Sequence, residues 1–168
     1  MDIAALLIGF TVWAEATVGA YGYLGIFMVS LLGNLSVIFP VPSFALVFAM
    51  GAILNPWLVG LAGGLGGGIG EISGYIIGRG GRKAIKKKYE KQLKRVRKWA
   101  GGHRTFAVIV LFGATPLPSD IIGIFAGLIH YDIRKFLLAS IIGKIIMSTY
   151  IAWAGYYSFD TIKIIFGV

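Results

Sequence analysis

The chain has no cysteine among its 168 residues and carries little charge, because Asp, Glu, Lys and Arg together make up only 14% of it. The absence of cysteine excludes disulfides, thiolate metal sites and thiol nucleophiles. Soluble domains devote about a quarter of their residues to charged side chains. This chain is instead 57% hydrophobic, with 25 glycines and a mean hydropathy of +0.82. Its composition predicts an all-α integral membrane protein.

The charge that is present is mostly basic and clustered. Of the 16 Lys and Arg residues, 12 lie between Arg79 and Arg104, and the net charge is +9. A short basic segment between apolar stretches is typical of a cytoplasmic loop, so we expect a multi-pass protein of the cell membrane with residues 80–103 in the cytoplasm. This segment is either an amphipathic helix on the anionic leaflet or only a topology loop. It contains no base-reading motif, so nucleic acid is not an expected partner.

One proline pattern occurs twice, 76 positions apart, and each copy reads Pro-x-Pro-Ser before a short apolar stretch that ends in glycine. Proline removes a backbone donor and clashes with the preceding turn, so a membrane helix should break at both places. Several of the apolar pieces beside the prolines are too short to cross a bilayer. The pattern predicts two re-entrant helical hairpins, broken at Pro40, Pro42, Pro116 and Pro118.

The basic segment also orients the two hairpins. Residues 58–78 and 133–156 are long enough to cross the membrane, and 58–78 ends at the cytoplasmic segment. The first hairpin then opens to the outside and the second to the cytoplasm, which is an inverted-topology repeat. We expect one polytopic domain made of an N-terminal helix (1–22), repeat 1 (23–79), the basic segment (80–103), repeat 2 (104–156) and a C-terminal tail (157–168).

Small residues mark one face of the predicted helix 58–78. Glycine recurs there at every fourth position, at Gly66, Gly70, Gly74 and Gly78. This spacing lets another helix approach the backbone closely. The partner helix would belong either to the same chain or to a second copy, so a homo-oligomer stays an open alternative.

Few ionisable side chains lie within the apolar segments, and each is costly there unless it is paired or faces water. Glu71 and Lys144 fall at similar depths on antiparallel helices, roughly 12–15 Å from the cytoplasmic side. Asp120 follows the second proline pair at about the same level. One interpretation is a midplane pocket in which Lys144 neutralises an anionic headgroup while Glu71 or Asp120 accepts and releases protons. The other is a purely structural ion pair.

Two serines follow the prolines and begin the returning half-helices. Ser43 would cap the first of these helices, and Ser119 or Asp120 the second, by accepting backbone N–H bonds, and a half-helix N-terminus also attracts phosphate. Arg134, at the cytoplasmic end of the last helix, is a further cation for a headgroup. His103 and His130 lack a convergent carboxylate, so neither a metal nor a cofactor is expected.

Four stretches together resemble the DedA family, also called the VTT-domain or SNARE-associated Golgi protein family. They are Phe39 to Ser43, the Gly-rich run from Gly66 to Arg79, Thr115 to Asp120, and Ala126-Gly127. The resemblance covers roughly residues 25 to 156. It implies two opposed re-entrant hairpins and a role in moving lipids across bilayers, with Glu71 and Asp120 at the positions of acidic residues of the family.

The chain departs from many bacterial members of this family at two places. Those members carry arginines three residues before and after a proline of the second hairpin, where this chain has Gly113 and Ser119. They also carry a glutamate near the first Pro-x-Pro, where this chain has Ser43-Phe44. The missing guanidinium groups favour a general phospholipid scramblase or an archaeal-type lipid carrier over a polyprenyl-phosphate carrier.

The sequence therefore predicts a transporter or scramblase that moves an anionic phospholipid or polyprenyl-phosphate headgroup, with membrane lipids as its partners. Glu71 and Asp120 would couple this movement to protons. A proton-coupled exporter of ions or small solutes is the main alternative, followed by a structural tether that acts through the basic segment. An enzyme is not expected, because no cluster of Ser, His and Arg is visible that would hold a phosphate for hydrolysis.

Overall fold

The computed structural model describes residues 19, 21–35, 43–81 and 103–166. Within these ranges the chain forms helices and no strand. The helices are α2 (Tyr23–Leu35), α3 (Ser43–Gly51), α4 (Pro56–Gly70), α5 (Ile72–Gly81), α7 (His103–Gly113), α8 (Ser119–Leu128) and α9 (Ile133–Phe166). The expectation of an all-α fold is confirmed for this part of the chain. Most of the N-terminal helix (1–22), the first proline pair (Pro40 and Pro42) and residues 82–102 lie outside it.

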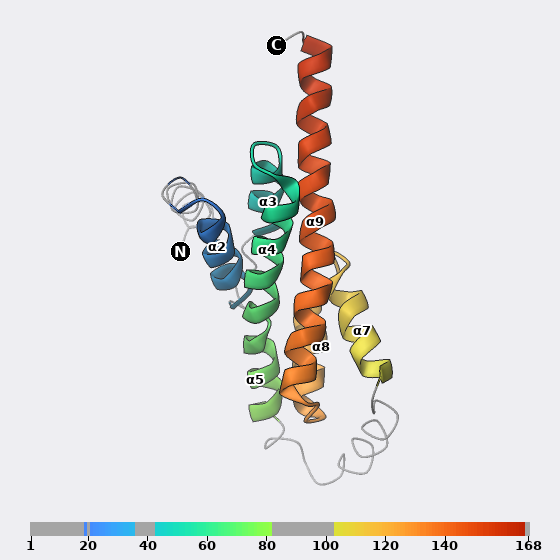
Figure 1. Ribbon diagram of the computed structural model, residues 1–168. Helices are drawn as coiled ribbons and strands as arrows, with labels where there is room; N and C mark the ends of the chain where they lie inside the picture. The colour runs from blue at the N-terminus through green and yellow to red at the C-terminus, as the bar shows by residue number, and fades with distance from the viewer. Residues whose placement is uncertain (1–18, 20, 36–42, 82–102, 167–168) are drawn as a thin grey trace, which may run out of the picture.

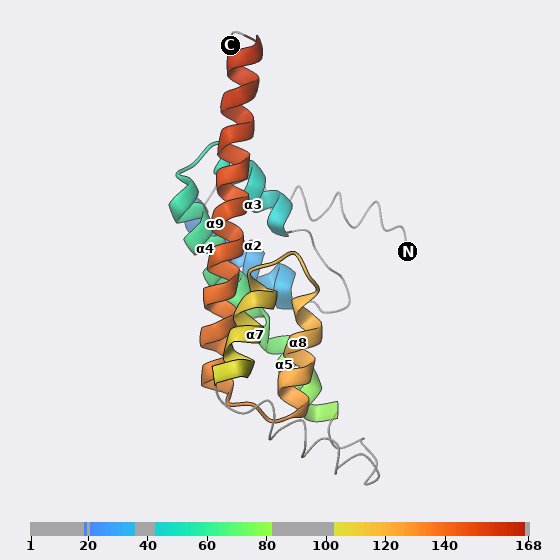
Figure 2. The same ribbon diagram turned by 90° about the vertical axis from the view of Figure 1, so that its right-hand side faces the viewer.

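The longest helix, α9, packs against α3, α4 and α7 along its length (Figure 1). α4 packs between α9 and α2, and α3 packs against the C-terminal half of α9. α7 packs against the N-terminal half of α9, and α8 packs against α5. Residues 114–118 join α7 to α8, so that these two helices form a hairpin beside α9 (Figure 2). The predicted break at the second proline pair is therefore present, with Pro116 and Pro118 in the connection.

Glycine determines how closely these helices approach. A Cβ atom at Gly66 or Gly70 would overlap the backbone of α2, and one at Gly78 would overlap the carbonyl oxygen of Ile124 in α8. A Cβ atom at Gly74 would make a tight contact of 3.3 Å with the carbonyl oxygen of Asp120, without the overlap of the other three. The predicted small-residue face thus packs within one chain, which leaves the homo-oligomer without support from this face. Three further glycines that the pattern did not include face α9: Gly60, Gly64 and Gly68.

The predicted crossing segment 58–78 is not one regular helix. α4 ends at Gly70 and α5 begins at Ile72, with Glu71 in a turn between them. The N–H of Glu71 still donates to the carbonyl of Gly67 at 3.2 Å, and the N–H of Tyr75 reaches the carbonyl of Glu71 only at 3.4 Å. Glycine-rich helices bend easily because nothing but backbone fixes their geometry. The irregular turn places the carboxylate of Glu71 inside the protein, where it is 2% exposed.

Two apolar clusters form the core, one at each end of the bundle. The first joins α2, α3, α4 and the C-terminal half of α9 through Ile26, Val47, Val59 and Ala152. The second joins α5, α7, α8 and the N-terminal half of α9 through Tyr75, Ile109, Ala126, Phe136 and Ala139. Glu71 lies between Val59 of the first cluster and Tyr75 of the second, and Lys144 lies on α9 between Ala139 and Ala152. The polar residues at mid-height are therefore enclosed by apolar packing above and below.

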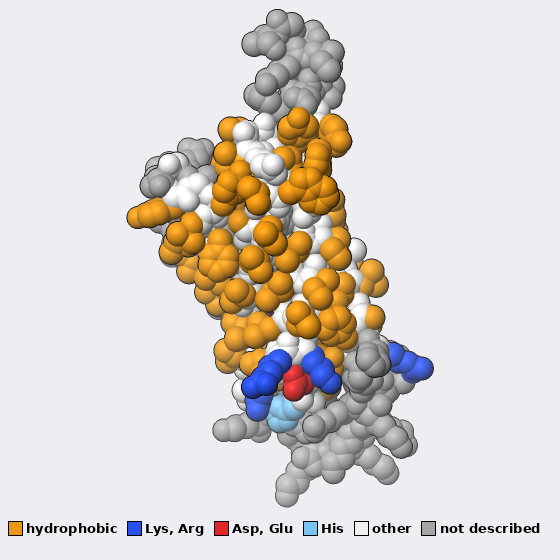
Figure 3. Space-filling view, viewed as in Figure 1, with side chains coloured by type: hydrophobic (Ala, Val, Ile, Leu, Met, Phe, Trp, Pro, Cys, Tyr) orange, Lys and Arg blue, Asp and Glu red, His pale blue; other side chains and the backbone are white. Residues whose placement is uncertain are grey.

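The outer surface is apolar over most of its height. Many large hydrophobic side chains are exposed there, and Figure 3 shows them as a continuous band with basic, acidic and histidine side chains gathered at one end. Among the described residues, one stretch, Ile133–Ser158 of α9, is long and apolar enough to cross a membrane. α9 continues to Phe166, past the predicted end of the crossing at 156 and into the predicted tail.

Asn55 starts α4, and its side chain gives a first testable prediction. The side-chain oxygen accepts hydrogen bonds from the N–H groups of Trp57 (3.0 Å) and Leu58 (3.4 Å), and Pro56 occupies the first helical position. We expect Asn55→Ala to lower the free energy of unfolding by about 0.5–2 kcal/mol, because both N–H groups lose their acceptor. Thermal unfolding in detergent micelles measures this loss. Asn55→Asp keeps the acceptor and is the control, so equal melting temperatures for the two variants would contradict the prediction.

Candidate functional site

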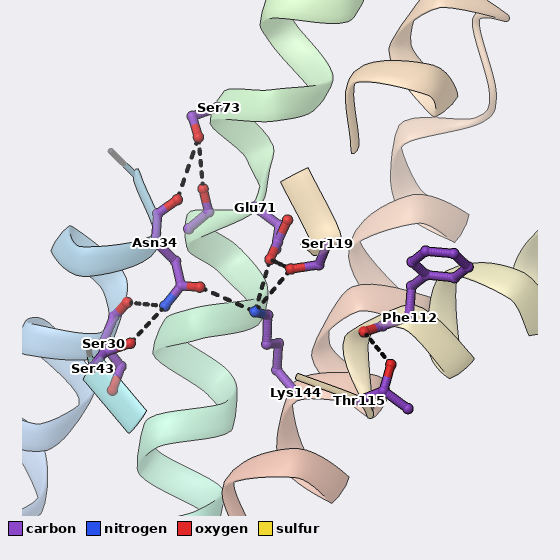
Figure 4. Close-up of polar contacts among 10 residues, drawn as sticks. Ser30, Asn34, Ser43, Glu71, Ser73, Phe112, Thr115, Ser119 and Lys144 are labelled. Carbon is purple, nitrogen blue, oxygen red and sulfur yellow. Dashed lines mark hydrogen bonds and ion pairs between the residues drawn. The ribbon is translucent and has the colours of Figure 1, made fainter. Parts of the chain in front are cut away.

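Lys144 of α9 is the centre of a polar network that joins α2, α8 and the turn between α4 and α5 (Figure 4). Its ammonium nitrogen Nζ lies 2.9 Å from Oε1 of Glu71, 3.1 Å from Oδ1 of Asn34 and 3.1 Å from Oγ of Ser119. An ammonium group has three N–H donors, so each can serve one of these acceptors. The proximity of Glu71 and Lys144 expected from their depth is therefore found. The Lys144 charge is fully hydrogen-bonded by protein groups.

Ser119 links the two members of the ion pair. Its hydroxyl donates to Oε1 of Glu71 at 2.5 Å while its oxygen accepts from Lys144. α8 has no side-chain cap, so the prediction that Ser119 caps this helix is wrong. The Ser119 hydroxyl bonds Glu71 and Lys144 instead of the backbone N–H groups of α8, because hydrogen bonds to charged groups are stronger than those between neutral groups.

Asn34, at the end of α2, extends the network to the first half of the chain. Its amide nitrogen donates to the carbonyl of Ser30 (2.8 Å) and to Oγ of Ser43 (3.2 Å), which begins α3. The carbonyl of Asn34 accepts from the hydroxyl of Ser73 (3.4 Å). These bonds aim the side-chain oxygen of Asn34 at Lys144. The starts of α3 and α8 are thus both joined to Lys144, the first through Asn34 and the second directly through Ser119.

The network borders an open pocket of about 360 Å³. Asn34, Ser43, Ser119, Asp120 and Lys144 contribute its polar wall. Its other walls come from α2, α3, α4, α9 and the connection with Pro116 and Pro118, and they include Ser30, Gly63, Phe44, Val47, Met147, Ser148 and Ile151. Glu71 does not line this pocket and is less exposed than Lys144, with side-chain exposures of 3% and 13%. Lys144 therefore faces the pocket, and Glu71 lies behind it.

The remaining predicted residues differ in their relation to this pocket. Asp120 lines it and lies within electrostatic range of Glu71 and Lys144, although its carboxylate has no hydrogen bond or ion pair within the described residues. Arg134 does not belong to the site: it is exposed in the first turn of α9, ten residues from Lys144, or roughly 15 Å along the helix. The glycines Gly66, Gly70, Gly74 and Gly78 act only in helix packing.

Asn34 is the main residue that the sequence-based candidates lack. An amide in an apolar helix is costly unless it is hydrogen-bonded. That signal was available in the sequence, since Asn34 is flanked by leucine and glycine in a long apolar stretch. The sequence did not indicate which residues would bond Asn34, because its partners lie up to 110 positions away. Ser30 and Ser73 carried less signal still, because serine is common in membrane helices.

Comparison with known proteins gives one result. The family model described as VTT domain matches residues 41–157, which is most of the chain and includes Glu71, Ser119 and Lys144 of the polar network. No curated protein and no solved structure matches. Proteins with this domain are associated with membranes and with membrane transport. The resemblance seen in the motifs is confirmed: the chain belongs to the DedA family of VTT-domain proteins.

Proposed function

We propose that this protein moves the anionic headgroup of a phospholipid across the membrane while the acyl chains stay in the bilayer. The observation that carries the proposal is the position of Lys144, a charged group on the wall of an open pocket at mid-height in an otherwise apolar bundle. An ionisable group at such a depth is costly, and its usual role is on a substrate path. A purely structural ion pair would need no pocket beside it.

We also propose that α7–α8 and α2–α3 belong to the two re-entrant hairpins, inserted from opposite sides of the membrane. α7 has 11 residues and α8 has 10, so each spans only about 15–17 Å of a core about 30 Å thick. α2 and α3 are similarly short, with 13 and 9 residues. The starts of α3 and α8 both connect to Lys144, as expected where two opposed hairpins meet at the midplane.

The charges of the site favour coupling to protons. With both carboxylates ionised, Glu71, Asp120 and Lys144 together carry a net charge of −1, which would repel an anionic headgroup. Protonation of one carboxylate makes the site neutral and removes this repulsion. Asp120 is the better proton carrier because it lines the pocket, whereas Glu71 lies behind Lys144.

Proteoliposomes that contain a trace of acyl-labelled fluorescent phosphatidylglycerol test the proposal. Dithionite bleaches label in the outer leaflet only, so bleaching beyond the level of protein-free vesicles measures lipid translocation. We expect rapid loss of the inner-leaflet signal with the wild-type protein. Bleaching that stops at the outer leaflet would contradict lipid translocation and favour the exporter of ions or small solutes.

The same assay tests the role of Asp120. We expect wild-type translocation to be about three- to tenfold faster at pH 6 than at pH 8, because a partly buried pocket wall disfavours an ionised carboxylate and a protonated carboxylate admits the anion. Asp120→Asn should remove this pH dependence, because the amide is neutral at both values. Asp132→Asn is the matched control, as Asp132 lies outside the pocket in the loop before α9. A pH dependence that survives in Asp120→Asn would show that another group carries the proton.

A further inference from the structure

The pocket has a second polar region one helical turn from Lys144. Ser148 follows Lys144 by four residues on α9, and Ser30 precedes Asn34 by four residues on α2, so each lies on the same helix face as its network neighbour. Both serines line the pocket. This second region contains hydroxyl groups and no charge.

The hydroxyl of Ser30 has no hydrogen-bond partner among the described residues, although Ser30 is only 1% exposed. The backbone carbonyl of Ser30 is used by Asn34, but the hydroxyl oxygen is not. A buried hydroxyl without a partner is destabilising, and in native proteins such a group is nearly always satisfied by protein, water or ligand. Because Ser30 lines the pocket, we infer that its partner is a group that fills the pocket.

Gly63 keeps the space between the two serines open. A Cβ atom at Gly63 would lie 3.5 Å from Oγ of Ser30 and 3.5 Å from Oγ of Ser148. Both hydroxyls thus border the same small volume beside Gly63, which Val47 Cγ2 also borders, 2.9 Å from the Cβ position. That volume suits a polar group that can donate and accept hydrogen bonds at once, as an alcohol does.

We propose that the pocket is a two-part headgroup site, in which Lys144 binds the phosphate and Ser30 and Ser148 bind hydroxyl groups of a polyol attached to it. The substrate class is then an anionic phosphodiester lipid with a hydroxylated headgroup, such as phosphoglycerol. The inference rests on the proposed function and specifies its substrate. Residues four apart on a helix have Cβ atoms roughly 5–6 Å apart, which is comparable with the length of a phosphoglycerol group. A choline headgroup has no donor for these serines and brings a cation towards Lys144.

The test compares two labelled lipids of equal charge in phosphatidylcholine vesicles. Phosphatidylglycerol carries the hydroxyl groups, and phosphatidylmethanol carries the same phosphodiester with a methyl group. We expect the wild-type protein to move phosphatidylglycerol about three- to tenfold faster, which is the effect of one or two neutral hydrogen bonds. Ser30→Ala should remove this preference by slowing phosphatidylglycerol alone, without lowering the melting temperature, because the hydroxyl has no protein partner to lose.

Two further variants make the result specific. Gly63→Ala places a methyl group between the hydroxyls and should also remove the preference, with Val47 Cγ2 at 2.9 Å as the side-chain atom that must shift. Ser158→Ala is the control, because Ser158 is exposed on α9 outside the pocket and donates to the carbonyl of Ala154. Equal wild-type rates for the two lipids, or equal slowing of both by Ser30→Ala, would overturn the hydroxyl site while leaving lipid translocation standing. Movement of neither lipid would overturn both proposals.

Discussion

Lys144→Met is expected to slow lipid translocation by about ten- to a hundredfold, the effect of losing one charge-assisted hydrogen bond of about 1.5–3 kcal/mol to the phosphate. The same change should destabilise the protein. It leaves the carboxylate of Glu71, which is 2% exposed, without its ion-pair partner. Removing one member of a buried pair typically costs about 3–5 kcal/mol. The dithionite assay measures the first effect and thermal unfolding in detergent the second.

A double variant separates the effect of Lys144 on translocation from its effect on stability. Glu71→Gln combined with Lys144→Met removes both charges and should restore much of the melting temperature, since replacing a whole buried pair by neutral groups is often close to neutral. Translocation should stay low, because the phosphate still lacks its cation. Lys135→Met is the matched control, an exposed lysine in the first turn of the same helix. If the double variant regains translocation along with stability, the ion pair is structural and Lys144 does not bind the headgroup.

Gly78→Ala is expected to lower the free energy of unfolding by about 1–3 kcal/mol, because its methyl group would overlap the carbonyl oxygen of Ile124. Backbone cannot move aside as a side chain does, so α5 and α8 would have to separate. α8 begins with Ser119, and its displacement would pull the hydroxyl away from Glu71 and Lys144. We therefore expect a partial loss of translocation as well, although Gly78 lies far from the pocket along α5.

Gly80→Ala on the same helix is the control for this prediction. A Cβ atom at Gly80 would meet nothing within 4 Å. Alanine has the higher helix propensity, so this variant should be as stable as the wild type or slightly more stable. Thermal unfolding of the two variants side by side gives the comparison. If both melt alike, α5 and α8 are not held in contact as described, and the argument for Gly78 is wrong.

The second proline motif illustrates what local sequence can predict. The expected break at residues 115–120 corresponds to the observed connection at 114–118, because proline acts on its own and the preceding turn whatever packs around it. The depth of Glu71 and Lys144 was also predictable, since an α-helix rises by 1.5 Å per residue. The ion pair between them, at 2.9 Å, agrees with that depth.

Ser119 and Asn34 illustrate the opposite case. Ser119 was expected to cap α8 and instead bonds Glu71 and Lys144, and Asn34 was not among the candidates although it donates to Ser43 and accepts from Lys144. The irregular turn at Glu71 was likewise not expected. Each of these features depends on which helix lies beside which, and at what rotation about its axis.

The sequence by itself determined the all-α class, the family, the position of the second proline break and the depth of each charge, because composition, proline chemistry and helical rise act locally. The tertiary structure alone decided that Lys144 uses all three of its donors and that the Gly66–Gly78 face packs within one chain. It also decided that the Ser30 hydroxyl has no partner among the described residues. The physical reason is that rotation and lateral packing of helices follow from many weak contacts between residues far apart in sequence. No short motif encodes them.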